Sequence, residues 1–375
     1  MGRVSRRELL RTAAGVGTMA LGATARAQDG VRRVRVAAVQ MHAVLGEVAV
    51  NLENAERWVR LALREQAQWI LLPEFFTTAI ALHPTKLVHA YRTLEGLPMQ
   101  LLKTLATEGH AYVGGSFLAR SGADVFNTFV LASPTGQVFT HDKDFPTTNI
   151  EASVYAGGED DEFVKEIARR GVACEPATPI PSRPQNVKSG VFIAGDGVTA
   201  GAALCWEQCR YRTARRLAGR VDLILAASGW PFVAPNDSIS RGTPSAGRDA
   251  LAAGAGIREA PRRLARLVGA PIIHASLVGD VWNTPPNGNA ALLRFSGESQ
   301  IADASGRTLA RRSYAEGEGL VIADIEIGRV APSESIPDAA SWTPEVSAQS
   351  QAAWATSGAA GRSVYISTTR PRRNR

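Results

Sequence analysis

From Val34 onward the sequence alternates between short apolar runs and longer amphipathic segments. Val34 to Val39 predicts a buried strand, and residues 49–66 then place apolar side chains at helical spacing. Further strands are expected near 69–72, 111–118, 126–132, 138–141, 198–204, 221–227, 271–277, 290–295, 299–301 and 320–325, and further helices near 97–108, 210–220 and 245–268. This alternation predicts an α/β fold with a mixed sheet covered by helices.

The composition allows the chain to bury a large hydrophobic core, and the charge distribution argues against a nucleic-acid partner. The chain has 375 residues, of which 45% are hydrophobic, and its formal net charge is +7. Residues 1–27 carry five arginines and one glutamate, and residues 370–375 carry four arginines, so the segment between them is close to neutral. Because it lacks the basic stripe that nucleic-acid binding requires, we expect no nucleic-acid partner.

The first 27 residues contain the parts of an export signal in the usual order. Residues 5–10 (SRRELL) resemble the twin-arginine signal, a short run rich in alanine and glycine follows, and residues 25–27 form an A-x-A cleavage pattern. The run is too short to span a bilayer of about 30 Å, which disfavours a membrane anchor. We expect cleavage after Ala27, export of the folded protein, and a periplasmic or secreted mature protein without a membrane span.

Two segments differ from the main domain, which we expect over residues 32–328. Residues 159–189 combine an acidic start, a short predicted helix near 163–170 and a proline cluster, which indicates a surface insertion. Residues 329–375 are rich in serine, alanine and proline and end in arginines. We expect this tail to be an extended arm, partly disordered.

A glutamate follows the second predicted strand. Residues 70–76 (ILLPEFF) place Glu74 between a proline and two phenylalanines. A poorly solvated carboxylate of this kind is suited to hold or pass a proton near neutral pH. Taken alone, the motif favours the alternative that Glu74 caps a helix.

A lysine lies among carboxylates after the strand predicted near 138–141. Residues 141–146 (HDKDFP) contain Lys143, and Glu151 follows. An ammonium group here could stabilise a developing oxyanion, with the carboxylates holding it in place. Taken alone, the composition favours a solvated charge cluster in a loop.

A cysteine lies between a predicted strand and a predicted helix in residues 202–207 (AALCWE). Helix N-terminal amides favour a thiolate and can donate to an oxyanion, which would suit a nucleophilic Cys205. A lone cysteine in such a place is more often a small buried apolar residue.

The three motifs in this order resemble the nitrilase, or carbon-nitrogen hydrolase, superfamily. The resemblance also covers residues 36–40 (VAAVQ) and residues 297–306 (GESQIADASG). It implies a four-layer α-β-β-α sandwich with mixed sheets. The segment between Lys143 and Cys205 is longer than the family's, and the excess is the 159–189 insertion. If it lies over the pocket, the insertion would narrow the substrate range.

The resemblance implies a chemical role for each residue. Cys205 attacks the carbonyl or nitrile carbon, Glu74 removes the thiol proton and later activates water, and Lys143 stabilises the oxyanion. The N–H of Trp206 would be a second oxyanion donor, and Glu151 would position the lysine and the substrate. Water resolves the thioester, or the thioimidate formed from a nitrile. No metal and no organic cofactor is implied.

The remaining candidates are aromatic residues, cysteines and histidines. Trp206 and Trp230 are expected to bind substrate, although core packing is an equal alternative for Trp230. Three cysteines argue against a disulfide scaffold, so Cys209 is expected to pack under the following helix rather than pair with Cys174. The six histidines lack metal-ligand spacing and are expected to be structural or surface residues.

The resemblance favours an amidase-type hydrolase acting on a small amide or carbamoyl compound. A nitrilase is the alternative, because residues 205–207 (CWE) resemble that branch. An acyltransferase is disfavoured because the lipoprotein-modifying members need several membrane spans, and a non-catalytic binding protein because all three matching residues are present. The resemblance also implies a homodimer or a larger homo-oligomer.

Overall fold

The computed structural model describes residues 32–82, 86–147, 149–174, 189–233, 246–284, 290–342 and 348–370. The predicted export signal therefore lies outside the described residues, as does the whole proline cluster of the 159–189 segment. No helix in the described ranges is both long enough and apolar enough to span a bilayer.

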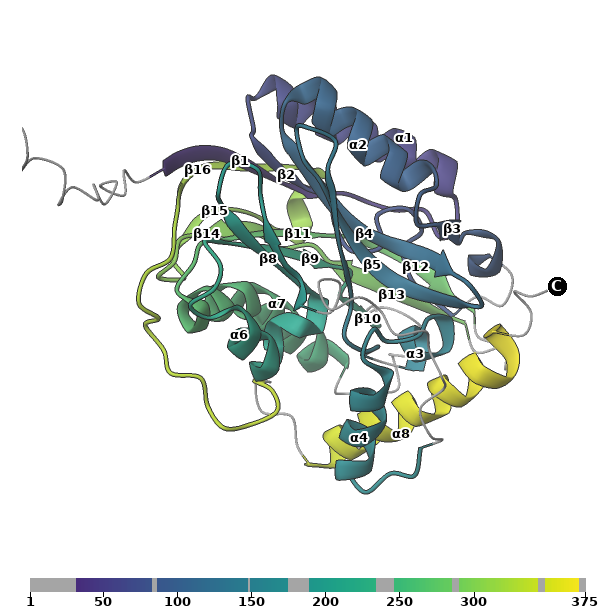
Figure 1. Cartoon of the computed structure of the whole chain (residues 1–375). Helices are drawn as coiled ribbons and strands as arrows, with labels where there is room; N and C mark the ends of the chain where they lie inside the picture. The colour runs from purple at the N-terminus through teal and green to yellow at the C-terminus, as the bar shows by residue number, and fades with distance from the viewer. Residues whose placement is uncertain are drawn as a thin grey trace, which may run out of the picture. The chain divides into compact units, whose positions relative to one another are not determined.

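Two large mixed sheets form the centre of the fold (Figure 1). The first has the order β16-β1-β2-β4-β5-β6, with β3 paired to β4, and the second has the order β15-β14-β11-β9-β8-β7. The first sheet contains β1 (Arg32–Gln40), β2 (Trp69–Leu71), β3 (Arg92–Thr93), β4 (Tyr112–Ser121), β5 (Asp124–Ala132), β6 (Val138–Asp142) and β16 (Gly319–Ile327). The second contains β7 (Val191–Ile193), β8 (Thr199–Leu204), β9 (Leu223–Ser228), β11 (Ile272–Ser276), β14 (Ser299–Ala302) and β15 (Thr308–Arg312). A smaller three-stranded sheet contains β10 (Pro231–Val233), β12 (Val278–Asn283) and β13 (Ala291–Ser296).

The side chains of each central strand alternate between two apolar layers. In β1, Val36 belongs to the layer between the two sheets and Ala37 to the layer under the helices. In β9, Leu225 belongs to the layer between the sheets and Ile224 to the opposite face. Successive side chains of a strand point to opposite faces, so a strand that is apolar throughout must be covered on both sides.

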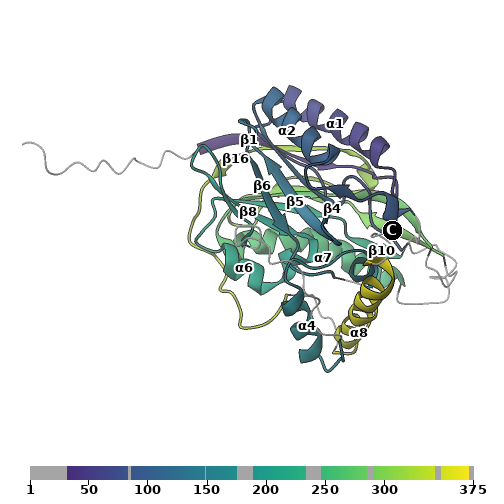
Figure 2. The same ribbon diagram turned by 45° about the vertical axis from the view of Figure 1, so that its right-hand side comes forward.

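Helices cover the two outer faces (Figures 1 and 2). The helices α1 (Val48–Arg64) and α2 (Leu97–Gly109) pack on the first sheet, and α6 (Tyr211–Leu217) and α7 (Ala246–Val268) pack on the second. In the described ranges, the short 3₁₀ helices are η1 (Leu87–His89), η2 (Cys205–Cys209) and η4 (Tyr314–Glu316). The layers therefore run helix, sheet, sheet, helix, which confirms the predicted fold class.

The C-terminal segment departs from the expected extended arm. Residues 348–364 form α8 (Ala348–Val364), followed by the π-helical turn η5 (Tyr365–Thr369), whereas residues 329–340 form neither helix nor strand. The helix packs against α3 (Asn149–Val154) and α4 (Asp160–Arg169). A Cβ at Gly361 would lie 2.6 Å from the carbonyl oxygen of Asn149, so the close approach of α8 to α3 requires glycine there.

Buried polar contacts fix the C-terminal helix in place. Arg362 donates two hydrogen bonds to the carboxylate of Asp160, at 3.0 and 2.7 Å, and both side chains are buried. The hydroxyl of Tyr365 donates to Asp124 at 2.8 Å. Because Asp160 begins α4, the contact with Arg362 ties α8 to the start of the predicted 159–189 insertion, and the Tyr365 contact ties η5 to β5.

Candidate active site

The three motifs at strand ends meet where the two large sheets face each other. Glu74 follows β2 and Lys143 follows β6 in the first sheet, whereas Cys205 follows β8 in the second sheet. All three side chains are buried, with residue exposures of 0 to 1%. The site therefore combines residues from both sheets of the sandwich.

Lys143 lies between two carboxylates. Its Nζ donates to Oε1 of Glu74 at 3.0 Å and to Oε2 of Glu151 at 2.8 Å. The two carboxylates and the sulfur of Cys205 lie within 4.8 Å of one another. The structure thus brings together the four residues predicted to be catalytic, and the Lys143 ammonium supplies the positive charge among them.

Neighbouring groups hold each carboxylate from a second side. Glu74 accepts a hydrogen bond from the side-chain amide of Asn127 at 2.7 Å and another from the backbone N–H of Gly229 at 2.8 Å. Glu151 accepts the backbone N–H of Thr147 at 2.9 Å and the hydroxyl of Tyr155. Neither Asn127 nor Tyr155 was predicted from the sequence to belong to the site.

Glu74 and Glu151 share the Lys143 ammonium, but their pKa values shift in opposite directions. Burial raises the pKa of Glu74, and the nearby Lys143 only partly opposes this shift. Burial acts in the same direction on Glu151, but Lys143 and the hydroxyl of Tyr155 outweigh it and hold the pKa of Glu151 below its usual value. Burial works to lower the pKa of Lys143, yet the two carboxylates raise it well above its usual value. Glu74 is therefore the carboxylate better able to take up a proton.

Cys205 is the first residue of η2, directly after β8, and its backbone conformation is strained. Its φ of 47° lies in the left-handed region, which a residue with a Cβ rarely adopts. Burial, followed by the negative charge of Glu74, raises the pKa of the thiol well above its usual value. The resting residue is therefore a thiol, and it requires a base to become a nucleophile.

Glu207 accepts hydrogen bonds from backbone N–H groups next to Lys143 and next to Cys205. Its Oε1 accepts the N–H of Asp144, next to Lys143, and its Oε2 accepts the N–H of Leu204, next to Cys205, both at 2.8 Å. His141 contacts the same carboxylate at 3.1 Å through its Nε2. Glu207 is buried, so its bonds fix the end of β6 relative to the end of β8.

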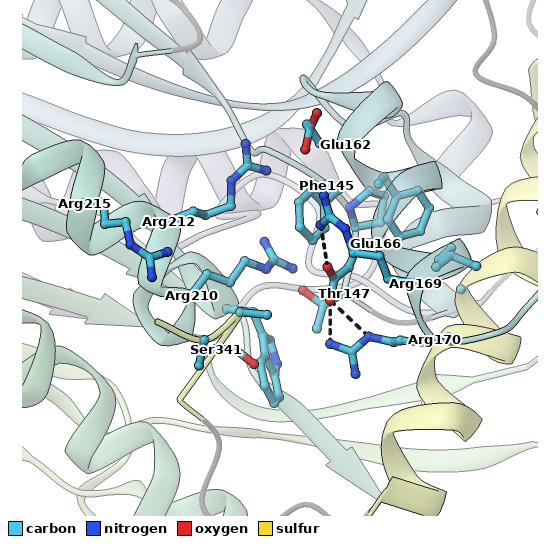
Figure 3. A pocket seen from close by; sticks show the side chains of 18 of the residues that line it. Phe145, Thr147, Glu162, Glu166, Arg169, Arg170, Arg210, Arg212, Arg215 and Ser341 are labelled. Carbon is cyan, nitrogen blue, oxygen red and sulfur yellow. Dashed lines mark hydrogen bonds and ion pairs between the residues drawn. The ribbon is translucent and has the colours of Figure 1, made fainter. Parts of the chain in front are cut away.

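The two tryptophans predicted to bind substrate lie side by side. The ring centroids of Trp206 and Trp230 are 4.9 Å apart. Trp206 lines the pocket of Figure 3, whereas Trp230 is buried in a cluster with Cys205 and Cys209. Cys209 is buried and forms no disulfide bond, so it is not paired with Cys174.

Comparisons with known proteins agree with this fold. The sequence model of the carbon-nitrogen hydrolase family matches residues 35–334. A search of curated proteins found no match. A carbon-nitrogen hydrolase from Helicobacter pylori has a similar structure, with a TM-score of 0.57 and 18% identity, over 79% of this chain and 90% of that chain.

Two further solved structures share the fold. A CN-hydrolase superfamily protein from Xanthomonas campestris has a TM-score of 0.51 and 19% identity, over 78% of this chain and 91% of that chain. An amidase from a Nesterenkonia species has a TM-score of 0.52 and 16% identity, over 78% of this chain and 90% of that chain. Since the family model covers most of the sequence and the fold is shared, the chain belongs to the carbon-nitrogen hydrolase family.

Proposed function

We propose that the protein hydrolyses the carbon-nitrogen bond of a small amide or carbamoyl compound through a thioester on Cys205. The observation that carries this proposal is the buried cluster of Glu74, Lys143, Glu151 and Cys205. A Nesterenkonia amidase of the same fold has an active-site cysteine that, in a mutant of that enzyme, adds to acrylamide. This supports a nucleophilic cysteine in the present chain.

The first half of the reaction forms the thioester. Glu74 takes the proton of the Cys205 thiol while the sulfur attacks the carbonyl carbon of the amide. The carbonyl oxygen becomes an oxyanion beside the Lys143 ammonium, with the backbone N–H of Trp206 as a second donor. When the tetrahedral intermediate collapses, the C–N bond breaks and Glu74 returns its proton to the leaving amine or ammonia.

The second half releases the acid. Glu74, again ionised, takes a proton from water, and the resulting hydroxide attacks the thioester carbon. The C–S bond breaks, the sulfur recovers a proton through Glu74, and the carboxylic acid leaves. Glu151 stays ionised throughout and holds Lys143 charged and in position, since its pKa lies below its usual value.

A panel of small amides and nitriles tests this proposal, with released ammonia as the readout. The wild-type chain should release ammonia from at least one amide, and Cys205→Ala should reduce this rate by at least about a thousandfold. Cys209→Ala is the matched control, because Cys209 is a second buried cysteine in the same apolar cluster that the mechanism does not use. Full activity in Cys205→Ala would rule out the thioester mechanism.

The same panel separates amidase from nitrilase. A nitrilase would release ammonia and acid from a nitrile through a thioimidate, and the sequence Cys205-Trp206-Glu207 resembles that branch. Since Glu207 binds two backbone N–H groups in the structure, its presence has a structural reason that applies to either activity. We expect the amides to respond and the nitriles to remain unchanged.

We also propose export by the twin-arginine route, on the basis of the sequence of residues 1–27. A double substitution, Arg6→Lys with Arg7→Lys, should leave the unprocessed chain inside the cell, whereas the wild-type chain should be recovered outside the inner membrane with residue 28 at its N-terminus. Processing of the variant at the wild-type rate would contradict this route.

A homodimer or larger homo-oligomer is proposed from the family resemblance alone. Sedimentation velocity of the mature protein at micromolar concentration should give at least twice the mass of one chain. A single species with the mass of one chain would contradict the proposal.

A further inference from the structure

Glu151 lies on α3, a helix of only six residues. Two of the groups that hold its carboxylate flank this helix: the backbone N–H of Thr147 comes before it, and the hydroxyl of Tyr155 comes directly after it. A helix this short is marginal in isolation, because its few hydrogen bonds do not offset the cost of ordering the backbone. The position of Glu151 against Lys143 therefore depends on what packs on α3.

The helix α3 is covered from two sides. Ile150 and Val154 pack on the apolar layer between the first sheet and its helices. Ala152 belongs instead to a separate apolar cluster that includes Phe163 of α4 and Ala359 of α8. One side of α3 thus lies on the core of the domain, and the other side is covered by α4 and the C-terminal helix.

The C-terminal segment makes direct contact with the backbone of α3. In the described part of the chain, α8 and η5 are the elements that pack most extensively on α3, and Figure 1 shows α8 in yellow beside it. A Cβ at Gly361 would lie 2.6 Å from the carbonyl oxygen of Asn149 and 2.9 Å from Cβ of Ala152. The hydroxyl of Thr369 donates to the carbonyl oxygen of Ser153 at 2.7 Å. The segment therefore contacts α3 near both of its ends.

A buried tyrosine links the same segment to the backbone beside the site. The hydroxyl of Tyr365 donates to Asp124 at 2.8 Å and accepts the N–H of Val125 at 3.2 Å. The carbonyl oxygen of Val125 accepts the N–H of Ala156, the residue after Tyr155, at 2.8 Å. Tyr365 is thus connected, through one residue of β5, to the backbone next to the tyrosine that holds Glu151.

We propose that the C-terminal segment formed by α8 and η5 is a positioning element of the active site, because it holds α3 on the domain and so sets the place of Glu151 against Lys143. It acts through Gly361, Arg362 and Tyr365. Both α8 and η5 lie beyond the region that the family model matches. This role rests on the proposed function, since Glu151 and Lys143 serve the same reaction.

Two alanine substitutions on α8 form a matched pair. Gly361→Ala places a Cβ against the backbone of α3, whereas Gly358→Ala places a Cβ 3.4 Å from the ring of Phe163, which is an ordinary contact. Both replace a glycine of the same helix with alanine, so they change its intrinsic stability by the same amount. Gly361→Ala is therefore the variant that should displace α8 from α3.

Hydrolysis of a responsive amide by the mature chain is the first readout. Gly361→Ala should lower kcat by about tenfold or more, because a shift of about 1 Å in a catalytic group can cost about a hundredfold. KM should change by less than about threefold, and Gly358→Ala should keep the wild-type kcat. If Gly361→Ala fails to fold, Tyr365→Phe, which removes only the hydroxyl, should lower kcat in the same way.

The pH profile separates positioning from a general loss of structure. The titratable groups near Glu74 are Lys143, Glu151, Tyr155 and the Cys205 thiol. Burial is the main cause of the raised pKa of Glu74, and the negative charge of Glu151 adds to it. Moving Glu151 away lowers the pKa of Glu74, so kcat/KM should begin to fall at a lower pH than in the wild type. A variant that is only less stable would lose activity without this shift.

Alkylation of Cys205 by iodoacetamide gives a second readout that does not require hydrolysis. The sulfur forms a bond to the methylene carbon, iodide leaves, and Glu74 takes the thiol proton. Mass spectrometry of the peptide containing Cys205 gives the rate at each pH. The alkylation rate should begin to fall at a lower pH in Gly361→Ala than in the wild type and in Gly358→Ala.

The outcomes distinguish this role from the proposed function. Wild-type values of both readouts in Gly361→Ala, or in Tyr365→Phe where Gly361→Ala does not fold, would overturn the positioning role. A loss of kcat without a shift in either pH profile would also overturn it. A shifted alkylation profile in a chain whose wild type releases no ammonia from any amide would support the positioning role and overturn the hydrolase.

Discussion

Replacing Glu207 with glutamine removes one of the two backbone hydrogen bonds that this buried side chain accepts. The native carboxylate accepts the N–H of Asp144 on one oxygen and that of Leu204 on the other. Glutamine has one oxygen, so its amide NH₂ must face one of these N–H groups and leave it unsatisfied, at a cost of about 1–3 kcal/mol. The remaining bond also loses its charge assistance, about 1 kcal/mol more. We expect the free energy of unfolding to fall by about 3 kcal/mol.

Guanidinium unfolding at about pH 7 measures this loss, with Glu316→Gln as the control. Glu316 also accepts a backbone N–H, that of Ser313 at 2.7 Å, but it lies on the surface, so its replacement should shift the midpoint far less. An unchanged midpoint for Glu207→Gln would refute the view that this carboxylate holds β6 and β8 together.

The stabilisation by the Glu207 carboxylate should depend on pH. Burial acts to raise the pKa of Glu207, but His141, Arg216 and the N–H of Leu204 outweigh it and hold the pKa below its ordinary value of 4.5. The stabilisation from the ionised group is therefore present above about pH 4.5 and is lost as the pH falls toward the lowered pKa. The difference in unfolding free energy between the wild type and Glu207→Gln should therefore be present at about pH 6 and shrink as the pH falls below about 4.5.

Three further predictions follow from the site and from the C-terminal helix. Lys143→Met should lower kcat by about 100- to 1000-fold in steady-state assays, and a smaller loss would contradict its oxyanion role. As the pH is lowered, kcat/KM should begin to fall at a pH above 4.5, because burial raises the pKa of Glu74 and this group must be ionised to accept a proton. A value of kcat/KM that stays constant down to pH 4 would contradict this. Arg362→Met should cost about 3–5 kcal/mol in urea unfolding because it removes a buried guanidinium that donates two hydrogen bonds to the buried carboxylate of Asp160. Arg35→Met, at an exposed ion pair, should change the free energy of unfolding little; equal shifts would contradict the role of burial.

The sheets were predictable because both faces of each central strand are buried. Runs such as Val36 to Val39 and Leu223 to Ala227 are apolar at successive positions, which is what a doubly covered strand requires. The strands β3, β7, β10, β12 and β15 were missed. In β12 and β15, charged residues such as Asp280 and Arg311 form ion pairs with distant partners that no local pattern reveals.

The predicted catalytic residues were identifiable because each follows an apolar strand in a short motif. Asn127 was missed because it lies in the middle of β5, where its sequence neighbours carry no sign that Glu74 is its partner. Tyr155 was missed because its contact with Glu151 depends on the short helix α3, which was not predicted.

The C-terminal helix shows where composition misleads. A segment rich in serine and alanine has little apolar surface, so the sequence indicated an extended arm. Alanine is nevertheless the strongest helix former, and the helix becomes stable by packing on α3 and α4 and through the buried pair of Arg362 with Asp160. Such long-range contacts are visible only in the folded chain.

In the proposed reaction an acyl group is carried by the sulfur of Cys205. Rapid acid quenching of the mature protein during turnover of a responsive amide, followed by intact-mass and peptide mass spectrometry, tests it most directly. The peptide containing Cys205 should gain the mass of the acyl group, and this adduct should be removed by hydroxylamine and be absent in Cys205→Ala. Ammonia release without any adduct, in a chain whose Cys205→Ala variant is equally active, would contradict it.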